Sequence, residues 1–301
     1  MNSVTHKASA LAAAFCIAAA SNCMAAADGI RPVSDLAATG MRGSVKMVLM
    51  DTYVAEDMAM DGSVNNLELS LETRDKKIFD RNGYVTYDST YTDGHSFLSL
   101  KEYDGINIER YCKYVIDCST EEENIIEEKI YTYDAQGRTA KFVLNTFVMG
   151  EDGKSVSSTA TEYLHFYTGD LIDSVRVTAP DGSKTYVIRR LDDNGSYEYL
   201  TTNASGSFEY DEGIRESARY DARQRLVYGG SADLSDEYTY DDRGDVIAST
   251  SGSGDDRESF AMKYTAYDAQ GNWTKGYMFA ITPEGEKICI NMFERKIEYW
   301  D

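Results

Sequence analysis

The sequence predicts an all-β protein, an extended, twisted or rolled antiparallel sheet of stacked β-hairpins. Three observations predict this fold class. A short segment that begins with Tyr-Asp and ends with Gly recurs along the chain. The chain contains 23 Tyr, 23 Gly and only 3 Pro. Segments rich in Tyr, Thr and Val separate the glycines, which is the residue usage of strands and turns. At ~10–14 residues per strand and turn, we expect roughly 18–20 strands.

The recurring segment is clearest at Tyr133–Gly137, and two further copies keep all its features, namely Tyr240–Gly244 and Tyr267–Gly271. Three other copies vary. Phe79–Gly83 has Phe in place of Tyr, Tyr220–Gln224 has lost its glycine, and Tyr103–Gly105 is shortened. Internal repeats of this kind indicate one supersecondary unit used many times, so we expect the hairpins to stack and bury a continuous face.

The chemistry of a turn explains the segment. An Asp carboxylate accepts a backbone N–H two residues further on, and Gly adopts a positive φ without steric cost. A type I turn followed by a left-handed Gly is a common hairpin connection. We therefore predict structural turn residues at Asp80, Gly83, Asp134, Gly137, Asp241, Gly244, Asp268 and Gly271. Plainer turns of the same kind are expected at Gly153, Gly182, Gly195 and Gly285.

Residues 32–50 differ from the repeats. Residues 32–38 are expected to form a short helix, with Ser34 or Asp35 near its N-terminus. The glycines Gly40 and Gly43 then end it. Residues 44–50 alternate as a first strand, and we expect this stretch to cap one end of the sheet.

The N-terminus predicts export. Residues 1–27 contain one charged side chain, Lys7, an apolar run from Ala8 to Ala20, and small residues before Asp28. This order is that of a secretory signal peptide, cleaved after Ala27. The apolar run is too short for a membrane span. Lipid modification of Cys23 is the alternative. We expect a periplasmic, cell-surface or secreted protein, in which residues 28–301 form a single β-hairpin repeat domain.

The net charge limits the expected kinds of partner, and the cysteine content limits the possible disulfides. The net charge of −21 makes nucleic acid an improbable partner, because phosphates would be repelled. The expected partner is a protein or a glycan. A disulfide between Cys112 and Cys118 requires a turn over residues 113–117, since a straight strand would hold them too far apart. The third cysteine of the exported chain, Cys289, leaves at least one thiol unpaired.

No cofactor or metal is expected. The two histidines of the exported chain, His95 and His165, are not near a Cys at the spacing of a zinc site. Residues 57–68 resemble a calcium loop in part, but position three is Ala59, which cannot bind the ion. An ordinary β-turn is the preferred interpretation there, with calcium as the alternative.

These residues resemble the YD-repeat (Rhs-type) proteins, and more closely the small secreted YD-repeat-like proteins of gut Bacteroidetes. The likeness covers residues 40–301 and includes Gly43–Lys46, Asp268–Lys275 and Glu294–Tyr299. It implies a rolled or twisted antiparallel sheet. Large Rhs-type proteins wind such repeats into a hollow shell around a toxic domain. The present chain is much smaller.

The sequence predicts a non-catalytic module that binds a ligand or has a structural role in the cell envelope or extracellular space. It has no Gly-x-Ser-x-Gly segment of a nucleophilic serine. Two alternatives stay open. A glycan hydrolase needs only two suitably placed carboxylates, and the chain has 51 acidic residues. A remnant or partner of an Rhs-type toxin system is the other. Trp273 and the tyrosines could form a platform on which sugars stack, but packing between strands is the preferred interpretation of tyrosines at these spacings.

Overall fold

The structure is a computed structural model that describes residues 34–55, 64, 68–92, 95–117, 122–150, 155–169, 171–180, 182, 185–190, 197–202, 208–221, 225–231, 235–253 and 256–301. The predicted signal peptide, Cys23, Cys118 and the turns at Gly153 and Gly195 lie outside these residues. So does the calcium-like segment, apart from Val64 and Glu68. The predictions for these positions stay predictions.

The described residues are nearly all β, and the predicted fold class is confirmed. Antiparallel strands β1 to β18 follow one another along the chain, with one four-residue helix, α2 (Asp35–Ala38). The chain forms two compact units. Of the described residues, the first unit contains 34–84 and 218–301, and the second contains 85–217. The expectation that residues 28–301 form one domain stays a prediction.

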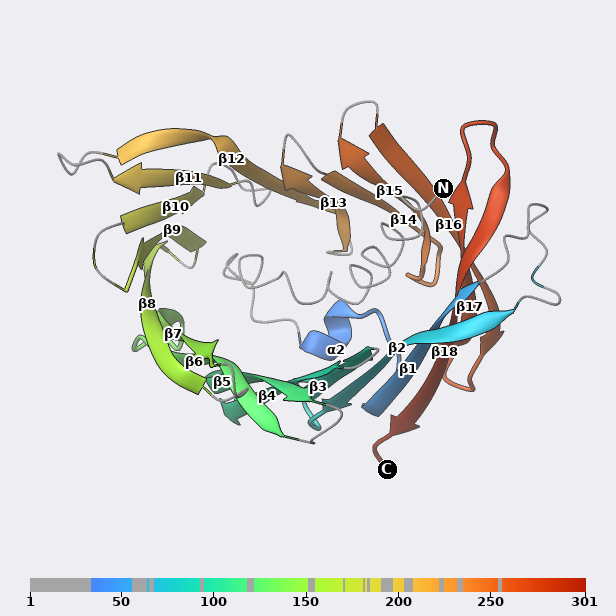
Figure 1. The fold of residues 1–301 in the computed structure, drawn as a ribbon, viewed down its shortest axis with the longest axis horizontal. Coiled ribbons are helices and arrows are strands. Elements are labelled where there is room, and N and C mark those ends of the chain that lie inside the picture. The colour runs from blue at the N-terminus through green and yellow to red at the C-terminus, as the bar shows by residue number, and fades with distance from the viewer. Residues whose placement is uncertain are drawn as a thin grey trace. The chain divides into compact units, whose positions relative to one another are not determined.

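The first unit contains an antiparallel sheet in which the order is β14, β15, β16, β17, β18, β1, β2, with β13 beside β14 (Figure 1). Its strands are β1 (Val45–Ala55), β2 (Leu69–Phe79), β13 (Leu226–Ser231), β14 (Ser235–Tyr240), β15 (Val246–Ser253), β16 (Asp256–Tyr267), β17 (Trp273–Ile281) and β18 (Lys287–Tyr299).

The second unit contains a succession of hairpins in which each strand pairs with the next along the chain, from β3 to β12. Its strands are β3 (Val85–Thr92), β4 (His95–Asp104), β5 (Asn107–Asp117), β6 (Glu123–Tyr133), β7 (Thr139–Met149), β8 (Ser155–Thr168), β9 (Leu171–Thr178), β10 (Thr185–Arg190), β11 (Tyr197–Thr202) and β12 (Phe208–Tyr220), of which β12 extends into the first unit by three residues.

The N-terminal strand does not cap an end of the sheet, which corrects the prediction. β1 lies between two strands, with Val48 opposite Ile297 of β18 on one side and Lys77 of β2 on the other. The strand pattern of residues 44–50 was correct, but periodicity gives no information on which strands become neighbours. Helix α2 forms as predicted, and the Leu36 N–H donates to the Gly83 carbonyl at 2.9 Å.

The core of the first unit lies on both faces of β17. Successive residues of a strand point to opposite faces. Met278 packs with Phe260, Trp273 and Phe293 on one face, whereas Tyr277 and Phe279 pack with Cys289 and Met292 on the other. This part of the sheet is therefore an internal layer. Among the residues of the second unit whose burial the structure describes, the buried apolar ones are Val85, Leu98, Cys112, Val175 and Val177.

The cysteines Cys112 and Cys289 are buried thiols that form no disulfide. Residues 113–117 belong to strand β5 and do not form the turn that a bridge to Cys118 requires. Burial raises the pKa of Cys289 to about 11, so this thiol stays protonated at neutral pH.

We predict that Gly137→Ala and Gly271→Ala each lower the free energy of unfolding by about 1 kcal/mol or more, because an L-residue is strained at positive φ. The φ angles are 78° and 83°. No atom lies within 4 Å of the position of a Cβ at Gly137, so the cost there is one of backbone conformation alone.

Gly229→Ala is the matched control for urea denaturation of these variants. Gly229 lies in β13 without a positive φ, and a Cβ there would meet the Leu226 side chain at an ordinary 3.5 Å. This variant should be neutral or slightly more stable, since Gly weakens a strand interior. Wild-type stability in both turn variants would contradict the turn assignment.

Candidate functional site

The eight predicted turn residues all lie in hairpin turns of one geometry. The Asp N–H donates to the carbonyl four residues further on at 2.8–2.9 Å, and the Gly N–H donates back to the Asp carbonyl at 3.0–3.1 Å. The four glycines, Gly83, Gly137, Gly244 and Gly271, have φ between 78° and 96°. The plainer turns at Gly182 and Gly285 also have positive φ, and each Gly N–H donates three residues back, to Ala179 and Thr282.

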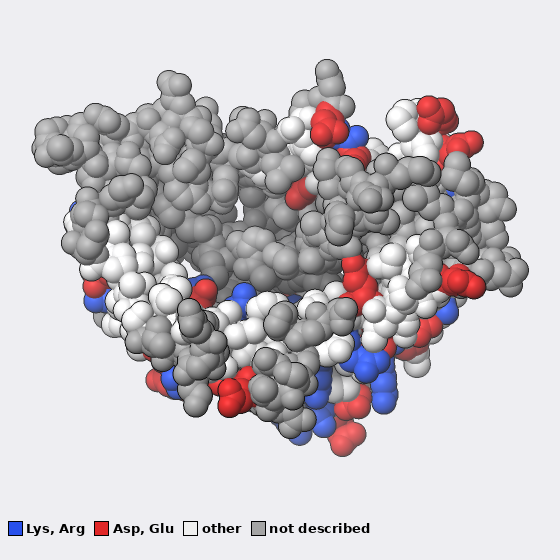
Figure 2. Space-filling model, viewed as in Figure 1, with Lys and Arg blue, Asp and Glu red and all other residues white. Residues whose placement is uncertain are grey.

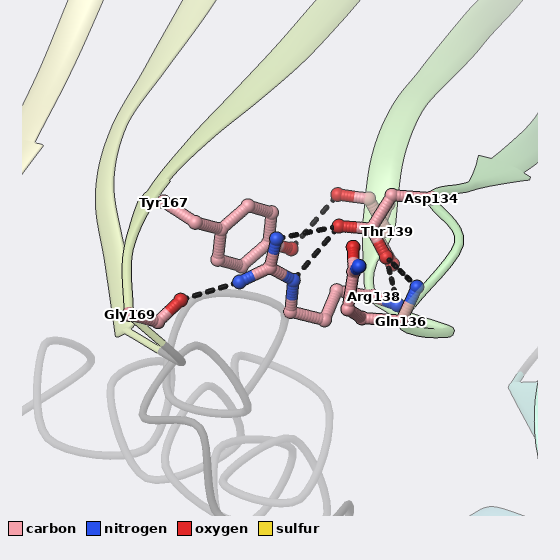
Figure 3. Close-up of polar contacts among 6 residues, drawn as sticks. All are labelled: Asp134, Gln136, Arg138, Thr139, Tyr167 and Gly169. Atoms are coloured by element: carbon pink, nitrogen blue, oxygen red, sulfur yellow. Dashed lines mark hydrogen bonds and ion pairs between the residues drawn. The ribbon is translucent and has the colours of Figure 1, made fainter.

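The aspartate carboxylate makes two backbone hydrogen bonds in each of these turns, one more than the sequence predicted. In the turn at Asp134, Oδ1 accepts the N–H of Gln136 and of Arg138, both at 2.9 Å (Figure 3). The carboxylates of Asp80, Asp241 and Asp268 accept the equivalent pairs at 2.8–3.0 Å. The motif acids are thus engaged in the turns.

An arginine occupies the other carboxylate oxygen in two repeats. Arg138 donates from Nε to Asp134 Oδ2 at 2.8 Å, and Arg225 does the same to Asp221 Oδ2 at 2.7 Å. Desolvation alone would raise the pKa of Asp134, but hydrogen bonds from the Arg138 backbone and guanidinium hold that pKa below its ordinary value. The Asp134 carboxylate is therefore ionised at neutral pH.

The same arginine contacts the next hairpin. The Arg138 guanidinium lies 4.2 Å from the centre of the Tyr167 ring and donates to the Gly169 carbonyl (Figure 3). Arg225 lies over the Tyr240 ring at 4.4 Å. A cation over an aromatic face is attracted by the ring quadrupole. Arg138 thus joins its own turn to its neighbour.

Tyrosine hydroxyls form a second set of links between hairpins. Each donates to a backbone carbonyl at the start of the strand that follows the preceding turn, at 2.7–2.9 Å, and the pairs are Tyr103 to Val85, Tyr133 to Ile108, Tyr167 to Thr139, Tyr240 to Leu226 and Tyr264 to Val246. Burial raises the pKa of Tyr240 to about 12, so its hydroxyl stays a donor. Packing between strands was expected of the tyrosines in general, and these hydroxyl bonds were not predicted. The adjacent Tyr-Asp pair was an available signal for Tyr103, Tyr133 and Tyr240.

Trp273 is not part of an exposed platform, so the platform alternative does not hold for that residue. It is 7% exposed and lies in the core cluster of the first unit. One contact is the Arg295 guanidinium, 3.3 Å from the ring centre, and another is the stacked Tyr264 ring at 5.0 Å. A sugar needs a free aromatic face, and these two neighbours stack on the Trp273 ring.

Aromatic rings of the second unit stack on one another across strands β6, β7 and β8. Phe142 lies 4.2 Å from Tyr163 with an interplanar angle of 13°, and 5.4 Å from Tyr131. His165 lies 5.8 Å from the same Phe142 ring. Burial lowers the pKa of His165 to about 4, and its buried Nδ1 has no hydrogen-bond partner among the described residues. The histidine is therefore neutral and packed, as its alternating strand position indicated.

The remaining candidate sites give no cluster. Among the residues that the structure describes, no three His, Cys, Asp or Glu side chains are grouped to hold a metal ion. His95 begins strand β4, and its side chain is outside the description. No helix in the described part of the chain has the length and apolar character needed to cross a membrane.

Comparisons with known proteins give distant structural likenesses. No protein-family model and no curated protein matches the chain. A porin-like protein from Bacteroides uniformis is 11% identical, with 86% of this chain and 99% of that one aligned and a TM-score of 0.38. The TcdB2-TccC3-TEV structure is 13% identical over 70% of this chain and 12% of that one, with a TM-score of 0.24. A LolA superfamily protein from Nitrosomonas europaea is 11% identical over 92% of each chain, with a TM-score of 0.20. No function follows from scores this low.

We predict that Tyr133→Phe lowers the free energy of unfolding by about 1 kcal/mol, because it removes the 2.8 Å hydrogen bond to the Ile108 carbonyl. Tyr163→Phe is the matched control, since the contact of Tyr163 is the ring stack on Phe142, which phenylalanine retains. Urea denaturation of both variants measures the difference. Equal stability of the two would mean that the hydroxyl link contributes nothing.

We also predict that His165 makes the fold sensitive to acid. The pKa is about 4 in the folded protein, against 6.5 as the ordinary value. The unfolded chain therefore binds the proton first, so this stability is fully present above pH 6.5 and is lost as the pH falls towards 4. The loss is up to about 3 kcal/mol.

The measurement is the difference in unfolding free energy between wild type and His165→Phe from pH 7 to pH 4. We expect wild type to lose stability relative to the variant over this range. The Tyr163→Phe protein should follow wild type, because that change removes no group that titrates there. A constant difference between wild type and His165→Phe would refute the prediction.

Proposed function

We propose that this protein is an exported, non-catalytic module of the cell envelope or extracellular space, which binds a partner or has a structural role through the surface of its sheet. The observation that carries the proposal is the use of the repeated motif. Its carboxylates accept backbone N–H groups, its arginines join neighbouring turns, and its tyrosines link hairpins. The most characteristic residues of the sequence therefore serve the scaffold.

The sheet surface supports a binding or structural role in a second way. Opposite charges pair across neighbouring strands, with Arg74 2.6 Å from Asp51, Arg110 2.7 Å from Glu128, and Lys275 2.9 Å from Glu294. Figure 2 shows basic and acidic side chains side by side on the face in view. Interspersed charges of this kind keep the surface of a sheet soluble. Their arrangement can also determine which partner binds, because a partner must present complementary charges.

The glycan hydrolase alternative has one residue in its favour. Asp75 is 7% exposed and lies in the middle of strand β2, away from any turn. A hydrolase of this type uses two carboxylates that face each other across the scissile bond. Asp75 is the one acid in the described core, so it identifies the first substitution to make if hydrolysis were observed.

Two assays on the chain from residue 28 test the proposal. We expect no hydrolysis of a panel of glycans and peptides, and retention of a protein or glycan in a pull-down from envelope extract. Hydrolysis that Asp75→Asn abolishes, in a variant that retains its unfolding temperature, would replace the proposal with the enzyme alternative. Asp104→Asn, at an exposed turn, is the control for loss of an acid in general.

A further inference from the structure

Two turns of the first unit lack the arginine that joins turns elsewhere. In the repeats that begin at Asp134 and Asp221, the residue four positions after the aspartate is Arg138 or Arg225, and it pairs with that aspartate. In the repeats at Asp241 and Asp268, the same position is Asp245 or Asn272. Arg243 of the first turn lies over the Tyr267 ring of the second at 4.5 Å, but neither turn has the arginine that pairs with its own aspartate.

Arg42, which is far away in sequence, contacts both of these turns. Its guanidinium donates from Nη1 to the Gly271 carbonyl of one turn and from Nη2 to the Arg243 carbonyl of the other. Arg138 contacts the glycine carbonyl of its neighbouring turn in the same way, at Gly169. The planar guanidinium suits this role because it presents several N–H donors in a fixed fork.

The Asn272 side chain binds the backbone of Arg42. The Arg42 N–H donates to Asn272 Oδ1 at 2.8 Å, and Asn272 Nδ2 donates to the Arg42 carbonyl at 2.9 Å. Asn272 is 3% exposed, and its Nδ2 also donates to the Tyr299 hydroxyl at 2.7 Å. That hydroxyl donates in turn to Asp268 Oδ2, the oxygen that arginine occupies in other repeats. An amide is therefore needed where the repeat has arginine.

The segment that carries Arg42 contacts the turn at Gly83 and the end of strand β18. We name residues 34–44 the latch segment. Leu36 binds the turn at Gly83, Gly43 lies against the Tyr299 ring, and the Ser44 carbonyl accepts the Trp300 N–H at 2.8 Å. A Cβ on Gly43 would be 3.2 Å from the Tyr299 ring, and its φ is 81°, so glycine is required at this contact.

We propose that the latch segment is a conformational device. It supplies, from a distant part of the same chain, an arginine to the turns at Asp241 and Asp268, and so fastens β1 to the C-terminal hairpins. Its opening releases the β1 side of β18 while the hairpins of the second unit stay intact. This inference does not depend on the proposed function.

Asp245 gives separate support. Its Oδ2 is buried and has no hydrogen-bond partner among the described residues. Burial and the charge of Asp241 raise the pKa of Asp245, and the charges of Arg42, Arg295 and Arg243 oppose that rise. Loss of Arg42 therefore leaves a buried carboxylate with less compensation, which adds to the cost of opening.

The test is hydrogen exchange on the whole chain from residue 28, comparing wild type with Arg42→Ala. Exchange in β1 and in the turn at Asp268 should accelerate by about tenfold or more, since bonds to charged groups are among the stronger ones. Strands β7 and β8 of the second unit should be unchanged. Arg257→Ala is the matched control, because Arg257 makes a 3.3 Å ion pair with Glu237 in the same unit.

Further variants keep the proposal testable if Arg42→Ala folds poorly. Arg42→Lys retains the charge but not the fork, and should accelerate exchange in β1 by less. Asn272→Ala should reproduce the Arg42→Ala pattern, and the double variant should be no worse than either alone, because both changes open one latch. Exchange in β1 equal to that of Arg257→Ala, or acceleration that extends equally to β7, would overturn the proposal.

Discussion

The structure depends on the pair of hydrogen bonds that one aspartate oxygen accepts from the backbone of its own turn. In the turn at Asp134 the two donors are the N–H groups of Gln136 and Arg138. These bonds fix the path of the four residues after the aspartate, including the glycine at positive φ and the Arg138 side chain that returns to Asp134. Without this local constraint, neither the arginine nor the tyrosine links could recur at constant geometry.

The links between turns follow from that constraint. In the turns at Asp134 and Asp241, the tyrosine directly before the aspartate reaches a carbonyl of the preceding hairpin, as Tyr133 reaches Ile108 and Tyr240 reaches Leu226. In the repeat at Asp268 the equivalent bond comes from Tyr264. An isolated hairpin is only marginally stable in water, so such links to the neighbours decide whether it persists. The motif therefore encodes two things, the turn itself and its attachment to the next.

Local features could be predicted from the sequence because they depend on residues that are close along the chain. The fold class, the hairpins and the glycines at positive φ all follow from spacing alone. The position of β1 between β2 and β18 could not be predicted, since alternation gives the faces of a strand and not its partners. The same limit applies to Trp273, for which the sequence left an exposed platform open as an alternative but which lies in a sheet buried on both faces. Residues 113–117 continue a strand because Tyr114 and Val115 keep pairing with β4.

The first unit combines the earliest and the latest strands of the chain, and this makes its assembly a non-local problem. Hairpins such as β7–β8 close over a few residues, whereas β1 and β18 are separated by the whole second unit. Closing a long loop costs conformational entropy before any contact compensates for it. β18 is also synthesised after the whole second unit, so β1 cannot be paired on that side until then. Contacts that are specific to this junction, namely Arg42 with two turns and Asn272 with the backbone of Arg42, offset the cost at two turns that lack the arginine found at Asp134 and Asp221. The departure of these two turns from the motif is thus matched by contacts that join the segment before β1 to the C-terminal hairpins.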